Sequence, residues 1–222
     1  MFTKSIAKMN SLEKRIIDIS YKEKIGHLSS NLNAVNIIDE IYQTKNKDDA
    51  FILSSGHAAL ALYAVLEKYH NLNAEALFHK HGVHPHRDID NNIYCSTGSL
   101  GLGITVAVGY ALANPNKNVY CLISDGEAAE GSVWESLRFI HEKKLNNCKI
   151  YANVNGMMAY DYLDSTYLIN RLKAFLPNIN IRQTTIPNWP FASGILTHYY
   201  VLKPQDYQLL CEIDWDNSLQ KL

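Results

Sequence analysis

The fold is decided by residues 119–131, VYCLISDGEAAEG, together with residues 150–156, IYANVNG. In both stretches a short apolar run ends in polar residues, at Asp125 in the first and at Asn155 in the second. Apolar runs of this length that end in turn-forming residues are typical of buried strands. The two polar residues are 155 − 125 = 30 positions apart, about the length of a strand–helix–strand unit. The pattern therefore predicts two parallel strands whose carboxyl ends carry Asp125 and Asn155.

Strand and helix patterns alternate along the rest of the chain. Strands are predicted at 50–53, 119–123, 150–154, 179–184 and 198–202, and helices at 5–24, 34–42, 58–69, 101–113, 130–143 and 167–175. This alternation predicts an α/β fold with a doubly wound, mainly parallel sheet and helices on both faces. No repeat or Pro/Gly-rich linker interrupts it, so residues 1–222 are expected to form a single domain. In such sheets ligands bind beyond the carboxyl ends of the strands, near a topological switch point.

The composition excludes several classes of protein. Hydrophobic residues make up 47% of the chain and charged residues 19%, which is typical of a globular domain and excludes a disordered one. A formal net charge of -1 does not favour nucleic acid or acidic membranes. The first residues, MFTKSIAKMN, lack the apolar core of a signal peptide, and no run approaches the roughly 18 apolar residues of a membrane span. Four scattered cysteines without a Cys-x-x-Cys pair predict reduced thiols in a cytoplasmic protein.

The two strand ends also predict a chemistry. One carboxylate and one amide oxygen converge at the same edge of the sheet. Mg²⁺ prefers oxygen ligands and takes only a few from protein, with phosphate and water supplying the rest. The pair therefore suits a magnesium diphosphate. A single Asp-Gly-Glu or Asn-Gly is usually a surface turn, and it is the pairing, the spacing and the preceding strands that favour a site. Nucleotide binding is disfavoured, because neither G-x-G-x-x-G after an early strand nor a P-loop motif is present.

A series of ordered motifs over roughly residues 5–160 resembles the thiamine-diphosphate-binding domain of the transketolase family. The family's Gly-Asp-Gly motif, with an Asn one strand–helix–strand unit later, is similar to Ser124-Asp125-Gly126 and Asn155. The other similar segments are GHLSSNLNAVNIIDEIY from Gly26, SSGHAALALYAVL with His57, His84-Pro85, STGSLGLGITVAVGYALA from Ser96, and EGSVWESL from Glu130.

The resemblance implies a role for individual residues. Asp125 and Asn155 would ligate Mg²⁺ through side-chain oxygens, and Met157 through its backbone carbonyl. The residues expected at thiamine diphosphate are His57, Gly98, Ser99, Leu100, Asp125, Gly126, Glu127 and Asn155. The catalytic residues would be His27 and His84, which would line the funnel above the thiazolium and handle sugar hydroxyls. Glu130 is similar to a family glutamate at the subunit interface.

The resemblance also implies a partner chain. In the family an activating glutamate comes from a pyrimidine-binding domain that follows this one, and residues 1–222 end before it. We therefore expect one half of a split transketolase-like enzyme, a heterodimer or a heterotetramer with twofold symmetry, inactive without its partner. Its reaction would be transfer of a two-carbon ketol unit from a ketose donor to an aldehyde or ketone acceptor, including a specialised sugar acceptor.

Departures from the family pattern leave alternatives open. Leu28-Ser29-Ser30 stands in place of Pro-Gly-Gly, and the sequence after Tyr160 matches poorly. His198, in the strand-like HYYVL, is a weak counterpart of the family's later active-site histidine. Rival functions are a thiamine-diphosphate-dependent enzyme that decarboxylates 2-oxo acids and a non-catalytic regulatory subunit. Four histidines at 79, 81, 84 and 86 are an alternative zinc site, disfavoured by their irregular spacing and the lack of a cysteine ligand.

Overall fold

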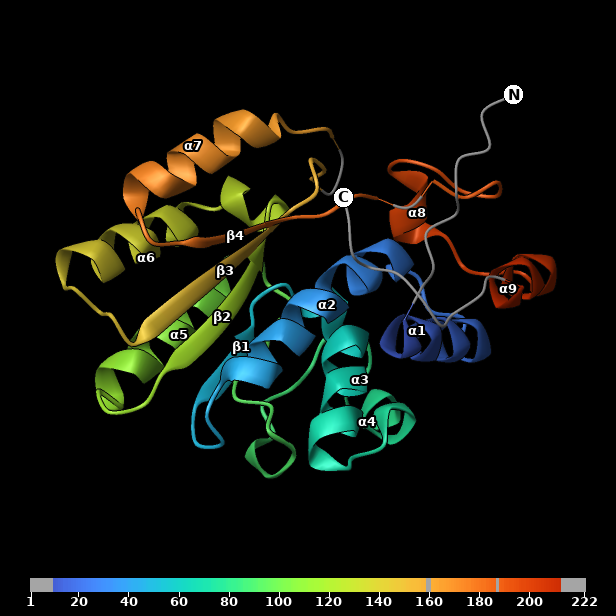
Figure 1. Ribbon diagram of the computed structural model, residues 1–222, viewed down its shortest axis with the longest axis horizontal. Helices are drawn as coiled ribbons and strands as arrows, with labels where there is room; N and C mark the ends of the chain where they lie inside the picture. Colours follow the sequence, from blue (N-terminus) through green and yellow to red (C-terminus); the bar gives the residue numbers. More distant parts are fainter. Residues whose placement is uncertain (1–9, 159–160, 187, 213–222) are drawn as a thin grey trace.

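The computed structural model describes residues 10–158, 161–186 and 188–212, and its sheet has four parallel strands. These strands are β1 (Ala50–Leu53), β2 (Val119–Ser124), β3 (Cys148–Val154) and β4 (Asn180–Gln183), in the spatial order β1-β2-β3-β4. Because all four run the same way, their carboxyl ends meet at one edge of the sheet (Figure 1). The order has no reversal, so the expected switch point is not found among the described strands.

Helices cover both faces of this sheet (Figure 1). One face carries α5 (Leu102–Ala113), α6 (Gly131–Glu142) and α7 (Ser165–Phe175), and the other carries α1 (Ser11–Lys22), α2 (Leu28–Thr44) and α3 (Ala59–His70). Successive strand residues point to opposite faces, so Cys121 and Ile123 of β2 join the first core and Leu122 joins the second. The predicted α/β class, parallel sheet and two helical layers are confirmed.

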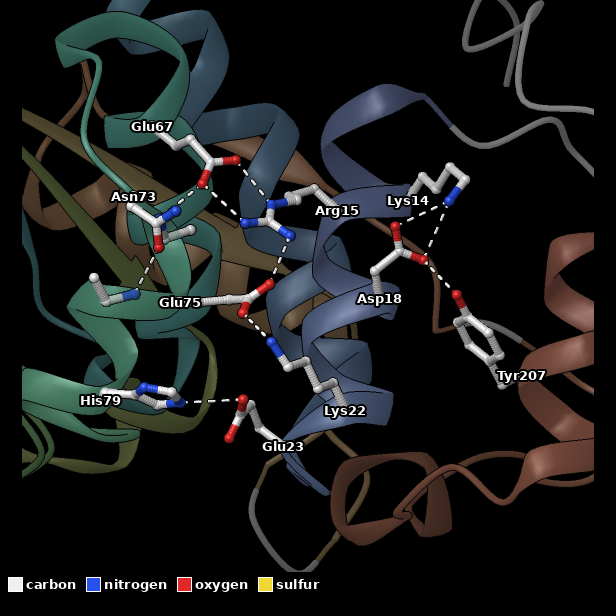
Figure 2. A network of polar contacts seen from close by, with 12 residues as sticks. Lys14, Arg15, Asp18, Lys22, Glu23, Glu67, Asn73, Glu75, His79 and Tyr207 are labelled. Carbon is white, nitrogen blue, oxygen red and sulfur yellow. Dashed lines mark hydrogen bonds and ion pairs between the residues drawn. The ribbon is translucent and has the colours of Figure 1, made fainter.

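A network of charged side chains joins α1 to α3 and α4 (Ala74–His81), as Figure 2 shows. The Arg15 guanidinium donates to Glu67 through Nε at 2.8 Å and to Glu75 at 3.0 Å, and Lys22 also pairs with Glu75. These side chains are partly exposed, so each pair adds little free energy of folding. The network therefore links three helices that also share an apolar core.

The last described helix, α9 (Pro204–Cys211), returns to this same layer. Tyr207 donates its hydroxyl to Asp18 at 3.0 Å and stacks on Tyr21 with ring centroids 4.2 Å apart. The segment before it forms the short helix α8 (Leu196–Tyr199), which packs against α2. The end of the described chain is therefore held close to its beginning.

The predicted elements agree with the structure except near that end. The strand predicted at 198–202 is wrong, because residues 196–199 are helical and no strand lies beside them in the described chain. The strand-like run HYYVL indicated a strand, but the Thr197 hydroxyl, which donates to the Gly194 carbonyl at 2.7 Å, supports a helical turn instead. Helices α4 and α9 were not predicted. Positions 5–9 of the first predicted helix lie outside the described residues.

Two further expectations concern the whole chain. The structure finds all four cysteines free, with Cys95, Cys121 and Cys148 buried and Cys211 exposed, as the lack of paired spacing predicted. No helix in the described ranges is long and apolar enough to cross a membrane.

Two glycines of α5 give a direct test of how this helix packs against β1. A methyl group at Gly103 would lie 2.5 Å from Ser54 Cα, whereas one at Gly109 would meet no atom within 4 Å. We expect Gly103→Ala to lower the free energy of unfolding by roughly 1–3 kcal/mol through overpacking. The matched Gly109→Ala variant should instead raise it by about 0.5–1 kcal/mol, because alanine favours the helix. Urea denaturation measures both, and equal effects would contradict the packing of α5 against β1.

Candidate functional site

The Asp125 carboxylate joins the ends of two neighbouring strands. Asp125 follows β2 directly and is 3% exposed. Its Oδ2 accepts hydrogen bonds from the backbone amides of Asn155 and Gly156, both at 2.8 Å, and from that of Met157 at 3.3 Å. Its Oδ1 accepts from Gly126 N at 3.2 Å. Burial raises the pKa of this carboxyl, and the hydrogen bonds from the backbone oppose that rise.

The loop that follows β3 completes this corner of the sheet. Asn155 Oδ1 accepts from Met157 N at 2.9 Å, so its amide oxygen lies within the same turn. Gly156 has φ +82°, which a side chain would strain. Gly126, by contrast, is not among the described residues with positive φ. The backbone conformation therefore requires glycine at position 156, in the loop after β3, but not at position 126, after β2.

The oxygen donors of this corner fit a small hard cation. Asp125 Oδ1 and Asn155 Oδ1 each accept one hydrogen bond, and an oxygen of either kind has a second lone pair. No group of three or more His, Cys, Asp or Glu residues suitable for a metal occurs in the described parts of the chain. An ion held here would thus take few protein ligands, which is how Mg²⁺ binds beside phosphates.

Glu127 is fully buried and faces a different set of loops. Its Oε1 accepts from Ser54 Oγ at 2.6 Å and from Gly101 N at 3.0 Å, and its Oε2 accepts from Ser124 N at 3.1 Å. Burial raises the pKa of the Glu127 carboxyl, and these bonds oppose that rise. Both carboxylate oxygens are thus occupied by protein donors, a placement that the sequence motif does not reveal.

The glycine-rich segment 96–103 comes close to two of the predicted histidines. A methyl group at Gly56, the residue before His57, would lie 2.7 Å from Gly98 N. One at Gly98, where φ is +139°, would lie 3.1 Å from the His84 ring. Gly98 and Ser99 are exposed, and Leu100 is half-buried. The backbone expected to contact the cofactor is therefore accessible and lies against His84.

Three imidazoles gather where α2 begins. His27 Nδ1 lies 3.0 Å from His198 Nε2, and the His57 ring centroid is 5.5 Å from those of both His27 and His198. Ser30 Oγ lies 3.0 Å from His198 Nδ1, and His27 N donates to the His198 carbonyl at 2.7 Å. From the sequence alone His198 was only a weak candidate, because only the return of the chain to α2 brings it to this cluster.

These imidazoles are neutral in the folded protein. Burial, reinforced by the neighbouring histidines, lowers the pKa of His57 to about 3 and that of His198 to about 4. Burial and nearby His84 also lower the pKa of His27. Neutral imidazole can donate from one ring nitrogen and accept at the other. The cluster is thus suited to bind hydroxyl groups and to pass protons.

The other predicted residues have distinct surroundings. Glu130 is exposed, and its Cβ would lie 2.8 Å from a methyl group at Gly101. His79 pairs with Glu23 at 3.1 Å, and His81 Nε2 lies 3.0 Å from Asp88 Oδ2. The alternative zinc site therefore has no support among the described residues, since these histidines engage separate carboxylates.

The histidine cluster predicts a particular pH dependence. The pKa values of His57 and His198 are lower in the folded protein than the ordinary value of about 6.5. Only the unfolded chain then takes up these protons between pH 6.5 and about 4, so their contribution to stability is full above pH 6.5 and declines as the pH falls. Urea denaturation at several pH values should give a smaller loss on acidification for His57→Gln than for the unsubstituted chain.

Comparing His57→Gln with the unsubstituted chain cancels the contribution of the Asp125 and Glu127 carboxyl groups to the pH dependence of stability. Their raised pKa values change stability in the opposite direction. NMR of the ring protons gives an independent check. A His57 or His198 ring that titrates near pH 6.5 in the folded protein would contradict the buried cluster.

The chain is similar to known proteins. The family model "Transketolase, thiamine diphosphate binding domain" matches residues 9–161. One of the subunits of the apulose-4-phosphate transketolase from Phocaeicola vulgatus is 32% identical over 154 residues, 60% of this chain and 54% of that protein. The 6-deoxy-6-sulfo-D-fructose transketolase subunit SqwG of a Clostridium species is 29% identical over 174 residues, 69% of this chain and 63% of that one.

A solved structure gives the same result for the fold. The transketolase of Campylobacter jejuni superposes with a TM-score of 0.71 at 21% identity, covering 94% of this chain and 43% of that one. At this identity the match concerns the fold alone. The chain thus spans roughly half the length of the proteins that it resembles.

Proposed function

Since the chain belongs to the family of transketolase thiamine-diphosphate-binding domains, we propose that it is one subunit of a split transketolase-like enzyme. Its reaction is transfer of a two-carbon ketol unit from a ketose donor to an aldehyde or ketone acceptor. The observation that carries the proposal is the Asp125 carboxylate, buried between the ends of β2 and β3 and next to the Asn155 amide oxygen.

The strand ends hold the cofactor in this proposal. Asp125, Asn155 and the Met157 carbonyl bind Mg²⁺, and the ion binds the diphosphate. His57, at the end of β1, and Gly126 contact the diphosphate as well. When bound, thiamine diphosphate supplies the reactive carbanion and the electron sink. The backbone of residues 98–100 receives its aminopyrimidine ring.

The imidazoles act on the sugar. His27, His198 and His84 hold the hydroxyl groups of the donor in register and move protons, a role for which the neutral rings of His27 and His198 are suited near pH 7. The hydrogen bond between His27 and His198 and the contact of His198 with Ser30 fix the direction of the ring nitrogens. His198 is thus added to the catalytic residues expected from the sequence.

A partner chain supplies the remaining groups. We propose that it carries the pyrimidine-binding domain with the activating glutamate, in a heterotetramer that places exposed Glu130 at the contact between the chains. The two curated relatives, each named as a transketolase subunit, support this arrangement. Mg²⁺ and a cytoplasmic location belong to the same proposal.

Removing the Asp125 carboxylate tests the cofactor site. We expect Asp125→Ala to weaken binding of thiamine diphosphate with Mg²⁺ by about 100-fold or more, because a metal ligand is lost together with the anchor of the Asn155 loop. Calorimetry with the full chain measures this, with Glu142→Ala as a control. Glu142 is exposed and pairs with Arg138 at the end of α6. Saturable binding that Asp125→Ala leaves intact would contradict the site.

Replacing His198 tests the reaction. In the complex with the partner, His198→Ala should lower kcat/KM for ketol transfer by about 100-fold, the usual contribution of one proton-transferring group. Its affinity for thiamine diphosphate should stay unchanged. Assays with ketose donors and with 2-oxo acids, monitored for CO₂, separate the transketolase reaction from decarboxylation. Release of CO₂ without ketol transfer would favour the decarboxylating enzyme, and full activity of Asp125→Ala would favour a regulatory subunit.

A further inference from the structure

Two carboxylates in the same short segment serve different loops. Asp125 and Glu127 are two residues apart, with Glu127 in the 3-10 turn η3 (Gly126–Ala129). Asp125 Oδ2 accepts only from the loop after β3, whereas Glu127 accepts from the end of β1, the end of β2 and Gly101, where α5 begins. Metal binding gives Asp125 a role in the proposed function, but it gives none to Glu127.

Gly101 is held on both sides of its backbone. Its N–H donates to Glu127 at 3.0 Å, and its carbonyl accepts from Ser132 Oγ at 2.9 Å. Its φ of +75° suits glycine. A methyl group here would lie 2.5 Å from Ser132 Oγ and 2.8 Å from Glu130 Cβ. A residue with a side chain would therefore not fit at this position. The backbone of Gly101 is held by its two hydrogen bonds.

Residues 98–100 lie between this anchor and a second one. At the far end, Gly98 packs against Gly56 and the His84 ring. At the near end, the only side-chain acceptor that the described structure gives to Gly101 N is Glu127. The segment is short enough that a shift of Gly101 must be transmitted to residues 98–100.

The state of Glu127 agrees with this role. Each of its three hydrogen bonds has the carboxylate as acceptor, which the ionised form satisfies without an unpaired proton. Its charge lies at the amino-terminal end of α5, where the helix dipole favours an anion. Glutamine at this position would keep the volume but would replace one accepting oxygen by an NH₂ group.

We propose that Glu127 is a positioning residue for thiamine diphosphate, which sets the backbone of residues 98–100 against the aminopyrimidine ring through Gly101. Asp125 holds the diphosphate end of the cofactor, and Glu127 determines where the ring end is received. The inference rests on the proposed function, because it concerns the same cofactor. It does not require Glu127 to touch the cofactor.

Two probes separate the ends of the cofactor. Calorimetry on the complex with the partner would compare binding of thiamine diphosphate with binding of inorganic pyrophosphate, each with Mg²⁺. Glu127→Gln is expected to weaken the binding of thiamine diphosphate about 10-fold or more, in the range seen for residues that orient a ligand indirectly. The affinity for pyrophosphate should stay within about 2-fold of that of the unsubstituted chain. Asp125→Ala should weaken both probes. Equal weakening of both by Glu127→Gln, or of neither, would overturn the proposal.

Two serine variants serve as a matched pair. Ser132→Ala removes the hydrogen bond to the Gly101 carbonyl. It should also weaken the binding of thiamine diphosphate but not that of pyrophosphate. Ser136→Ala removes a hydroxyl one turn later on α6, which donates to Ser132 O at 2.7 Å, and should change neither affinity. If Ser136→Ala reproduced the effect of Glu127→Gln, general loosening of α6 would replace the specific role of Glu127.

Amide hydrogen exchange tests the anchor without any cofactor. The Gly101 amide should exchange at least about 10-fold faster in Glu127→Ala, which removes its buried acceptor, while the amides of β3 stay unchanged. Unchanged protection of Gly101 would overturn the positioning role. If the complex of the unsubstituted chain with its partner bound neither probe, the cofactor function would fail, and this measurement would still decide whether Glu127 orders the segment.

Discussion

The buried Asp125 carboxylate, which accepts three amides from the loop after β3, is the interaction on which the candidate site depends. A carboxylate is costly to bury unless it is hydrogen-bonded, so the loops that donate to it have little freedom. Glu127 repeats this logic for β1, β2 and α5. The two carboxylates can bind these loops only if the ends of β1, β2 and β3 lie at one edge of the sheet. The parallel direction of the strands places them there.

Local patterns were sufficient to predict most of the fold and the corner around Asp125. The strand at 50–53 was predicted with the observed bounds, because four buried residues are followed directly by Ser54, Ser55 and Gly56. The approach of Asn155 to Asp125 followed from spacing and parallel strand direction alone. Glycines 56, 98 and 101 have tight surroundings, in agreement with their places in the motifs.

Orientation and long-range contacts were not predictable in this way. Residues 198–202, HYYVL, are strand-like in sequence, yet no neighbouring strand is available in the described sheet and His198 lies in a short helix against α2. Its hydrogen bond to His27 spans 171 residues, which no local pattern encodes. In the same way, the motif around Asp125 includes Glu127 without indicating that its side chain turns toward Ser54 and Gly101.

The span between His27 and His198 has a consequence for the order in which the site is assembled during synthesis. All partners of Asp125 have emerged from the ribosome once residue 157 is free, whereas the imidazole cluster has to wait for residue 198. Contacts between distant residues also form slowly. A nascent chain can thus complete the hydrogen bonds around Asp125 before it forms the contact between His27 and His198.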